Sequence, residues 1–265
     1  MSTTSDETKA PRVASGASTA AGPRRRRSLG GYLFMPVVLG LVLLFTYLAV
    51  SRRDLSPTES SRLAFDYIVA KTVEHLELTI ASTVLVLVIA IPVGILLTRS
   101  FSRAITPAAI AVFNIGQAVP TIGLLFIFAI TWSIGFVPVV VALTAYTTLP
   151  VLRNTMVGLT QVDASVIESA RGMGMTKLAV LTRIELPLAV PVIMAGLRTA
   201  LTINVGTATL ATFVGAGALG ELIVSGFSDV SPFITIVAGI LVAVLALIVD
   251  YLAGIAEDVL RPRGL

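Results

Sequence analysis

The chain has 265 residues, of which 55% are hydrophobic and only 13% are charged, and its mean hydropathy is +0.94. A typical soluble domain carries roughly 25% charged residues, so water is not the main solvent of this protein. There is no cysteine, and His75 is the only histidine. These absences exclude a disulfide framework, a thiolate metal site and a histidine-dependent catalytic triad, and we expect no metal site in the chain.

The net charge of +4 comes entirely from the N-terminal tail. Residues 1–27 hold six basic and two acidic side chains. The rest of the chain is therefore neutral overall, which argues against nucleic acid as a partner. The tail is rich in Ser, Thr, Ala, Gly and Pro, so residues 1–30 are predicted to form a disordered, basic, cytoplasmic segment. Its Arg24–Arg27 cluster is a topogenic signal or, alternatively, a contact with anionic membrane lipid.

Six stretches are apolar and long enough to cross a bilayer, which takes about 20 mostly apolar residues. We expect an all-α, polytopic membrane protein with about six spans, at residues 33–50, 78–98, 107–130, 136–152, 188–213 and 233–256. The connection with Arg99 and Arg103 is basic, as is the one from Arg153 to Arg183, and the loops between them are not. The positive-inside rule then places both termini in the cytoplasm.

The first span is predicted to stand apart from the others. Residues 31–72 would form a retained transmembrane anchor and an external loop, residues 73–257 the main transmembrane domain, and residues 258–265 a cytoplasmic C-terminus. A cleaved signal peptide is the alternative for the first span, but its apolar core is long and no clear cleavage site precedes Arg52. His75 is expected near the start of the second span as a solvated helix-end group.

The connection between the fourth and fifth spans is long and patterned. Ser165 and Glu168 have the spacing of a capping box, which predicts a short helix that begins near Ser165. Gly172 and Gly174 are expected to end this helix, since Gly174 allows a backbone turn that a side chain would obstruct.

A second short helix is predicted directly after this glycine turn. Thr176 can cap it, and it would continue through Ile184. Leu186-Pro187 would then mark re-entry into the membrane. Two short helices around a glycine turn, at residues 163–187, are suited to dock into a groove of a partner protein.

The same connection resembles the EAA loop of bacterial ABC import permeases. It contains Glu168-Ser169-Ala170, three residues, Gly174, nine residues and then Ile184-Glu185-Leu186-Pro187. Every element of the family pattern is matched in spacing, with only the middle alanine changed, to Ser169. The resemblance implies the type I ABC importer permease fold and a coupling helix that sits in a cleft of the ATPase subunit. The residues implied in coupling are Glu168, Ala170, Arg171, Gly172 and Gly174, and those at the end of the loop are Ile184, Leu186 and Pro187.

A wider resemblance, over about residues 74–257, is to the osmoprotectant permeases that import glycine betaine, choline or carnitine. Ala164 departs from it, since a proline is usual there, and many of these permeases lack the long tail and first span. The resemblance implies a bacterial cell membrane protein. Its implied partners are a second permease copy or homologous permease, ATPase subunits and an external substrate-binding protein. The matching segments include His75–Thr79, Gln117–Pro120, Leu149–Thr155, Glu168–Thr176, Glu185–Ala189, Pro191–Ala200 and Gly206–Leu210.

The chain contains no G-K-[ST] sequence, so it has no phosphate-cradling loop. We expect no cofactor in this chain and no enzymatic activity, because ATP and magnesium would be bound by the separate ATPase. Three alternatives stay open. They are a permease for methionine or another amino acid, an ATP-independent secondary transporter, and a membrane enzyme, which would need clustered ionisable residues in the bilayer.

Two ionisable residues, Arg198 and Asp250, fall inside apolar spans, where an isolated charge costs at least about 2.5 kcal/mol. We expect them to pair and to fix helix packing, with a gate contact as the alternative. Quaternary ammonium ligands are normally held by aromatic cages, yet Trp132 is the only tryptophan. Selectivity is then expected in the binding protein, and the passage is predicted to be lined by Gln117, Asn204 and Thr207.

Overall fold

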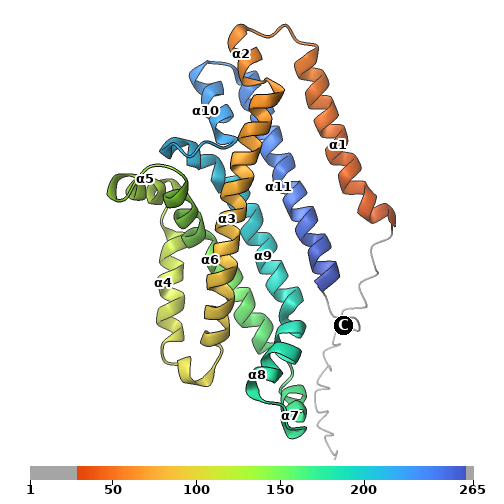
Figure 1. The fold of residues 1–265 in the computed structure, drawn as a ribbon, viewed down its shortest axis with the longest axis vertical. Helices are drawn as coiled ribbons and strands as arrows, with labels where there is room; N and C mark the ends of the chain where they lie inside the picture. The colour runs from red at the N-terminus through yellow and green to blue at the C-terminus, as the bar shows by residue number, and fades with distance from the viewer. Residues whose placement is uncertain (1–28, 261–265) are drawn as a thin grey trace, which may run out of the picture.

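The structure is a computed structural model that describes residues 29–260, within which every regular element is helical. Figure 1 shows a bundle of long helices with α2 and α10 at one end and α7 and α8 at the other, here called the α10 end and the α7/α8 end. Nearly all of the predicted tail and most of residues 258–265 lie outside the described residues. The elements are α1 (Leu29–Ser51), α2 (Pro57–Arg62), α3 (Phe65–Leu97), the 3₁₀ turn η1 (Ser100–Ser102), α4 (Thr106–Ala118), α5 (Thr121–Thr131), α6 (Phe136–Thr160), α7 (Ala164–Gly172), α8 (Lys177–Val180), the π-helical turn η2 (Leu181–Glu185), α9 (Leu186–Ala208), the 3₁₀ turn η3 (Thr209–Val214), α10 (Gly220–Ser228) and α11 (Pro232–Leu260).

Five helical segments of the described chain are long and apolar enough to cross a membrane, and together with one bent pair they give up to six spans. The predicted all-α, polytopic architecture with about six spans is therefore confirmed. The sixth candidate consists of α4 and α5, which are bent by 91° relative to each other. The candidate span over residues 107–130 is thus divided into two helices. The five single segments are Tyr32–Ser51, Phe65–Leu97, Phe136–Thr160, Lys177–Val214 and Pro232–Leu260.

The bend between α4 and α5 lies at Val119 and Pro120. A proline ring crowds the preceding residue out of the helical region, and Val119 is accordingly extended, with φ −74° and ψ 129°. Pro120 is also non-helical, with ψ 128°, and α5 starts at the next residue. In Figure 1, α5 consequently lies across the direction of α4.

The centre of the bundle is α6. Of the residues in its most apolar stretch, 61% are buried, against 28% for the corresponding stretches of α3 and α11. Small residues let neighbouring helices approach it closely, as is common between membrane helices. A Cβ at Gly94 of α3 would lie 2.8 Å from the Thr155 side chain, and one at Gly196 of α9 would lie 2.6 Å from Asn154 Cβ. The core is therefore an α3–α6–α9 block.

The first helix, α1, lies at the edge of the bundle beside α11 (Figure 1). Only 11% of its most apolar stretch is buried, and its exposed face carries large apolar side chains such as Phe34 and Phe45. A helix of this kind suits a lipid environment. Two hydrogen bonds join it to α11: Tyr32 Oη donates to Asp258 Oδ2 at 2.7 Å, and Tyr251 Oη donates to the Tyr32 carbonyl at 2.7 Å.

Candidate functional site

The hairpin of α7 and α8 begins with Asp163, which caps α7. The Asp163 carboxylate accepts the Ser165 N–H at 2.8 Å. Hydrogen bonds from Ser165, first from its backbone N–H, lower the pKa of the Asp163 carboxyl. The predicted capping box of Ser165 and Glu168 is therefore wrong. An aspartate two residues earlier already satisfies a free N–H of the first turn, and Glu168 is left exposed.

The hairpin turns at Gly174, whose φ is +88°. Its N–H donates to the Arg171 carbonyl at 3.0 Å, which closes the end of α7. A positive φ costs other residues roughly 1–2 kcal/mol. The turn needs glycine for this conformation and not for space, because a Cβ at Gly174 would meet nothing within 4 Å. Thr176 then caps α8 as predicted, with Oγ1 accepting the Ala179 N–H at 3.2 Å.

The outer surface of the hairpin combines charged and apolar side chains. Glu168, Arg171, Gly172 and Gly174 are exposed. Ala170 is instead buried, with 1% exposure. Large apolar side chains are exposed on the same hairpin, namely Val166 at 42%, Met173 at 78% and Leu178 at 68%. An apolar patch rimmed by charges is typical of a protein–protein contact.

At its root the hairpin is continuous with a membrane helix. The chain passes from α8 through η2 into α9 without a break, and Leu186-Pro187 stands at the start of α9. The Leu186 N–H donates to the Leu181 carbonyl, five residues back, in the wide pattern of a π turn. This widening accommodates the ring of Pro187, which would crowd an ordinary helix. Ile184, Leu186 and Pro187 are all half-buried.

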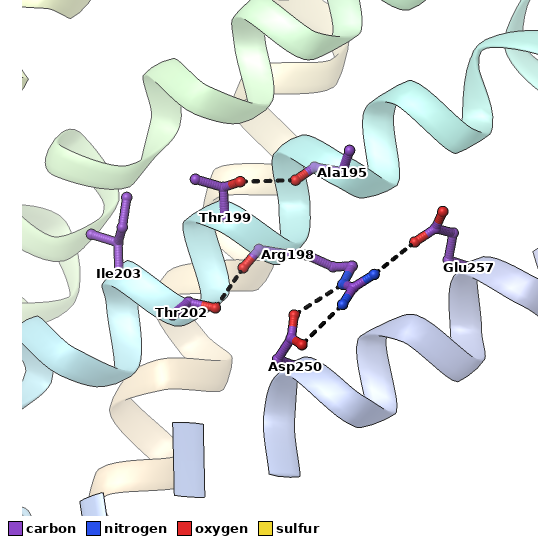
Figure 2. A pocket seen from close by; sticks show the side chains of 7 residues that line it. All are labelled: Ala195, Arg198, Thr199, Thr202, Ile203, Asp250 and Glu257. Carbon is purple, nitrogen blue, oxygen red and sulfur yellow. Dashed lines mark hydrogen bonds and ion pairs between the residues drawn. The ribbon is translucent and has the colours of Figure 1, made fainter. Parts of the chain in front are cut away.

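The structure brings Arg198 of α9 against Asp250 of α11. Figure 2 shows the guanidinium between two carboxylates: Nε and Nη2 donate to Asp250 at 2.9 Å each, and Nη1 donates to Glu257 at 3.2 Å. Glu257 was missed from the sequence, although it lies two turns beyond Asp250 on one helix face. The three side chains line an open pocket of about 500 Å³ together with Ala195, Thr199, Thr202 and Ile203.

Two of the residues predicted to line a passage make contacts between or within helices. Gln117 is half-buried, and its Nε2 donates to the Tyr146 carbonyl at 3.1 Å, which ties the end of α4 to α6. Thr207 is also half-buried, and its hydroxyl donates to the Ile203 carbonyl of its own helix at 2.8 Å. Their part in a pathway stays a prediction.

The third of these residues, Asn204, is buried between α9 and α3, with 1% exposure. Its Nδ2 donates to Ser82 Oγ at 2.6 Å. His75 lies nearby in the same interface, fully buried, with Nε2 2.9 Å from the Val205 carbonyl. The expectation of a solvated helix end at His75 is wrong, because α3 already begins at Phe65 and places the ring inside the bundle. Neither His75 Nδ1 nor Asn204 Oδ1 has a hydrogen-bond partner.

The structure also contains an ionic network at the α10 end that was not predicted from the sequence. Lys71 Nζ lies 2.7 Å from Glu221 and 3.0 Å from Glu74, and Glu74 accepts the Ala218 N–H at 2.9 Å. Partial burial works to raise the pKa of Glu221, but hydrogen bonds from Lys71 and from Tyr67 outweigh it and lower that pKa. The i, i+3 spacing of Lys71 and Glu74 was the available signal; the partners on α10 were not predictable from spacing.

A second ion pair missed in the sequence joins Arg99, just beyond α3, to Glu185 of η2, with Nη2 and Oε2 2.6 Å apart. Glu185 belongs to the segment Ile184-Glu185-Leu186-Pro187 at the end of the EAA-loop pattern. Nothing local in the sequence identifies Arg99 as its partner. The site therefore comprises a projecting hairpin whose root is tied to two membrane helices, one by chain continuity and one by an ion pair.

A bundle of helices that are long and apolar enough to span a membrane, with such a hairpin at one end, defines a multi-pass membrane protein. Residues 90–261 match the family of the binding-protein-dependent transport system inner membrane component. The chain belongs to this family.

Curated relatives share much of the chain. The choline transport system permease protein OpuBB of Bacillus subtilis (strain 168) is 40% identical over 195 residues, which is 74% of this chain and 89% of that protein. The glycine betaine/carnitine/choline transport system permease protein OpuCB of the same organism gives the same values. The osmoprotectant import permease protein OsmY of Salmonella typhimurium (strain LT2) is 42% identical over 67% of this chain and 75% of its own length.

Solved structures of ABC transporters have the same fold. The chain superposes on the inward-facing MetNI methionine ABC transporter with a TM-score of 0.67 and 24% identity, covering 78% of this chain and all of that one. An amino acid ABC transporter solved with histidines gives a TM-score of 0.60 at 16% identity, over 77% and 97% of the two chains. These likenesses concern the fold alone, and they confirm the predicted type I ABC importer permease fold.

Proposed function

We propose that the chain is the membrane-spanning subunit of an ABC importer for osmoprotectants of the glycine betaine, choline and carnitine type. The observation that carries the proposal is the hairpin of α7 and α8, in a chain of this family whose relatives are permeases for these compounds. Alternating access would move the substrate inward, with the energy supplied by a separate ATPase subunit. The chain itself would hydrolyse no ATP, in keeping with its lack of a G-K-[ST] loop.

The hairpin is the proposed contact with the ATPase. Exposed Glu168 and Arg171 offer charges of both signs, and exposed Met173 and Leu178 offer apolar area for a groove to bury. Gly174 fixes the angle between the two short helices through its positive φ. Because η2 and α9 continue the hairpin, a displacement of the docked hairpin would be passed directly into the membrane.

The α7/α8 end is accordingly the proposed cytoplasmic end, with both termini on that side of a bacterial cell membrane. A second permease, identical or homologous, would complete the passage, and an external binding protein would deliver substrate at the α10 end. Gln117, Asn204 and Thr207 remain the proposed lining residues; of these, Thr207 and Gln117 are partly exposed in the single chain.

Import of methionine is the weaker alternative. The likenesses to two crystal forms of the methionine transporter are 24% and 29% identical, whereas permeases named for choline and osmoprotectants are 40% and 42% identical. Fold is shared by transporters of many substrates. The closer sequence relatives therefore favour osmoprotectants.

The test is uptake by the assembled importer. The chain would be purified with its ATPase and binding protein, reconstituted in vesicles and supplied with ATP inside. We expect uptake of labelled choline, glycine betaine or carnitine, together with ATP hydrolysis that rises when the loaded binding protein is added. Uptake of methionine but of none of these three would refute the substrate assignment. Uptake without any ATPase subunit would refute the transporter class.

A further inference from the structure

The ion pair of Arg99 and Glu185 joins parts of the chain that are 86 residues apart in sequence. It is two-pronged: Nη2 donates to Oε2 at 2.6 Å and Nη1 donates to Oε1 at 3.3 Å. This fork geometry fixes orientation as well as distance, and lysine cannot reproduce it. The pair therefore holds two backbones in one relative arrangement.

On one side, the pair is anchored to the end of α3. The Arg99 N–H donates to the Leu96 carbonyl at 3.1 Å, and Nε donates to the Ile95 carbonyl at 3.3 Å. A cation is favoured there, since the last carbonyls of a helix carry partial negative charge. The following turn is fixed as well, because Ser102, with 1% exposure, donates its N–H to the Arg99 carbonyl. The guanidinium is thus a rigid extension of α3.

On the other side, the pair is anchored at the root of the hairpin. Glu185 is the last residue of η2 and is only 6% exposed. The neighbouring apolar cluster includes Leu181, Leu186, Leu159 and Ile95. A carboxylate left unpaired in such surroundings would be strongly destabilising. Among the described residues, Arg99 is the one basic side chain within ion-pair distance of Glu185.

The two anchors differ in how they are connected to the hairpin. The helix α9 follows the hairpin through an unbroken helix, whereas α3 has no covalent connection to it nearby. Within residues 29–260, no other hydrogen bond or ion pair joins the last turn of α3 to η2. Apolar packing alone lets helices slide past one another, but a forked ion pair resists sliding.

We infer that Arg99 and Glu185 are positioning residues for coupling. They hold the end of α3 to the root of the hairpin throughout the nucleotide cycle, so that α3 moves with α9 as one body. This inference rests on the proposed function. It assigns a role to the pair in transmission, beyond its contribution to folding.

The first test uses the complete importer in vesicles and measures substrate transported per ATP hydrolysed. Arg99→Glu and Glu185→Arg should each lower this ratio about tenfold, the size of coupling between directly contacting residues, while ATP hydrolysis persists. The combined Arg99→Glu/Glu185→Arg variant should recover much of the ratio. The matched control is Arg103→Glu, because Arg103 lies in the same connection, is exposed and makes no side-chain hydrogen bond or ion pair with the described residues; it should leave the ratio unchanged.

Three outcomes would separate a coupling role of the ion pair from a purely structural role and from a failure of the proposed function. Single variants in which assembly, uptake and ATP hydrolysis all fall in the same proportion, so that the ratio is unchanged, would show a purely structural pair and overturn the inference. The inference would also be overturned if the combined Arg99→Glu/Glu185→Arg variant recovered none of the lost transport per ATP. If the unmodified importer shows no ATP-driven uptake of osmoprotectants, the proposed function fails before any variant is compared.

The second test asks whether the two sides stay together. The chain has no native cysteine, so Arg99→Cys/Glu185→Cys creates a single pair of thiols that a short bismaleimide can bridge. Bridging should restore transport per ATP relative to the same variant blocked with a monofunctional maleimide. Bridged protein that hydrolyses ATP but no longer transports would mean that the two sides must separate during the cycle, and this would overturn the inference.

Discussion

Replacing Arg198 with alanine tests how charges are balanced inside the bundle. The guanidinium binds Asp250 through two donors and Glu257 through a third. Arg198→Ala therefore leaves two carboxylates of α11 beside the pocket without a cation. Asp250→Asn leaves the guanidinium still bound to Glu257. The two single changes should consequently differ, although a simple pair would make them equivalent.

The loss of stability expected from each change follows from how deeply the side chains of the ion pair are buried. Removing one partner of a fully buried pair costs about 3–5 kcal/mol, and a surface pair is worth about 0–1 kcal/mol. The side chains here are 29% and 33% exposed. We therefore expect Arg198→Ala to cost about 2–3 kcal/mol, close to the price of an isolated charge in a span. Asp250→Asn should cost about 1.5 kcal/mol, the lower end of the range for one hydrogen bond to a charged group.

Thermal unfolding of the purified importer measures this difference, with uptake as a second readout. For a chain of this size, Arg198→Ala should lower the thermal midpoint by about 4–12 °C. Adding Asp250→Asn and Glu257→Gln to Arg198→Ala should recover most of the loss, since no charge is then left unpaired. The reasoning is refuted if Asp250→Asn is as damaging as Arg198→Ala, or if the triple variant is no better than Arg198→Ala alone.

Three further predictions concern other parts of the structure. Gly174→Ala should lower transport per ATP, because a positive φ costs alanine roughly 1–2 kcal/mol in the proposed coupling turn. Gly196→Val should impair folding by a few kcal/mol, since its added atoms would overlap Asn154 of α6; yield and thermal midpoint would show it. The pKa of Glu221 is lowered in the folded chain, so its pairing with Lys71 stabilises the protein above the unfolded pKa of about 4.3 and is lost as pH falls below that value.

Matched variants make each of these predictions refutable. Gly172→Ala adds the same methyl group next to the turn without a positive φ, so equal effects at both glycines would contradict the conformational argument. Gly206→Val adds the same side chain to α9 in open space and should be tolerated. Glu221→Gln should flatten the loss of thermal midpoint on acidification from pH 6 to pH 3.5, as measured by unfolding; an unchanged pH profile would remove Glu221 as its cause.

Much of the fold was predictable because the bilayer imposes length and composition on each span. Five of the six expected spans correspond to single helical segments, and the hairpin was marked by its glycines and by Thr176. The bend before α5 was only partly predictable. Pro120 signals that a helix is disturbed, but whether the chain kinks or turns by 91° depends on what the next helix packs against.

The errors share a physical cause, which is that local spacing says little about contacts between distant segments. The sequence placed His75 near a helix end, but α3 begins at Phe65. The hydrogen-bond partner of His75 is the Val205 carbonyl, 130 residues away. Ser165 had capping-box spacing, but Asp163 competes for the same N–H and wins. Each outcome was decided by a contact or by a helix boundary that sequence spacing alone does not give.

The arrangement of contacts along α9 bears on how a docked hairpin would act on the membrane. Glu185 joins the start of this helix to α3, and Arg198 joins its middle to α11. The residues are 13 positions apart, so the two ion pairs are about 20 Å apart along the helix. Two such contacts spaced along one helix oppose pivoting of α9 about either contact, which a single contact would allow. Motion of the hairpin should therefore tilt α3, α9 and α11 together.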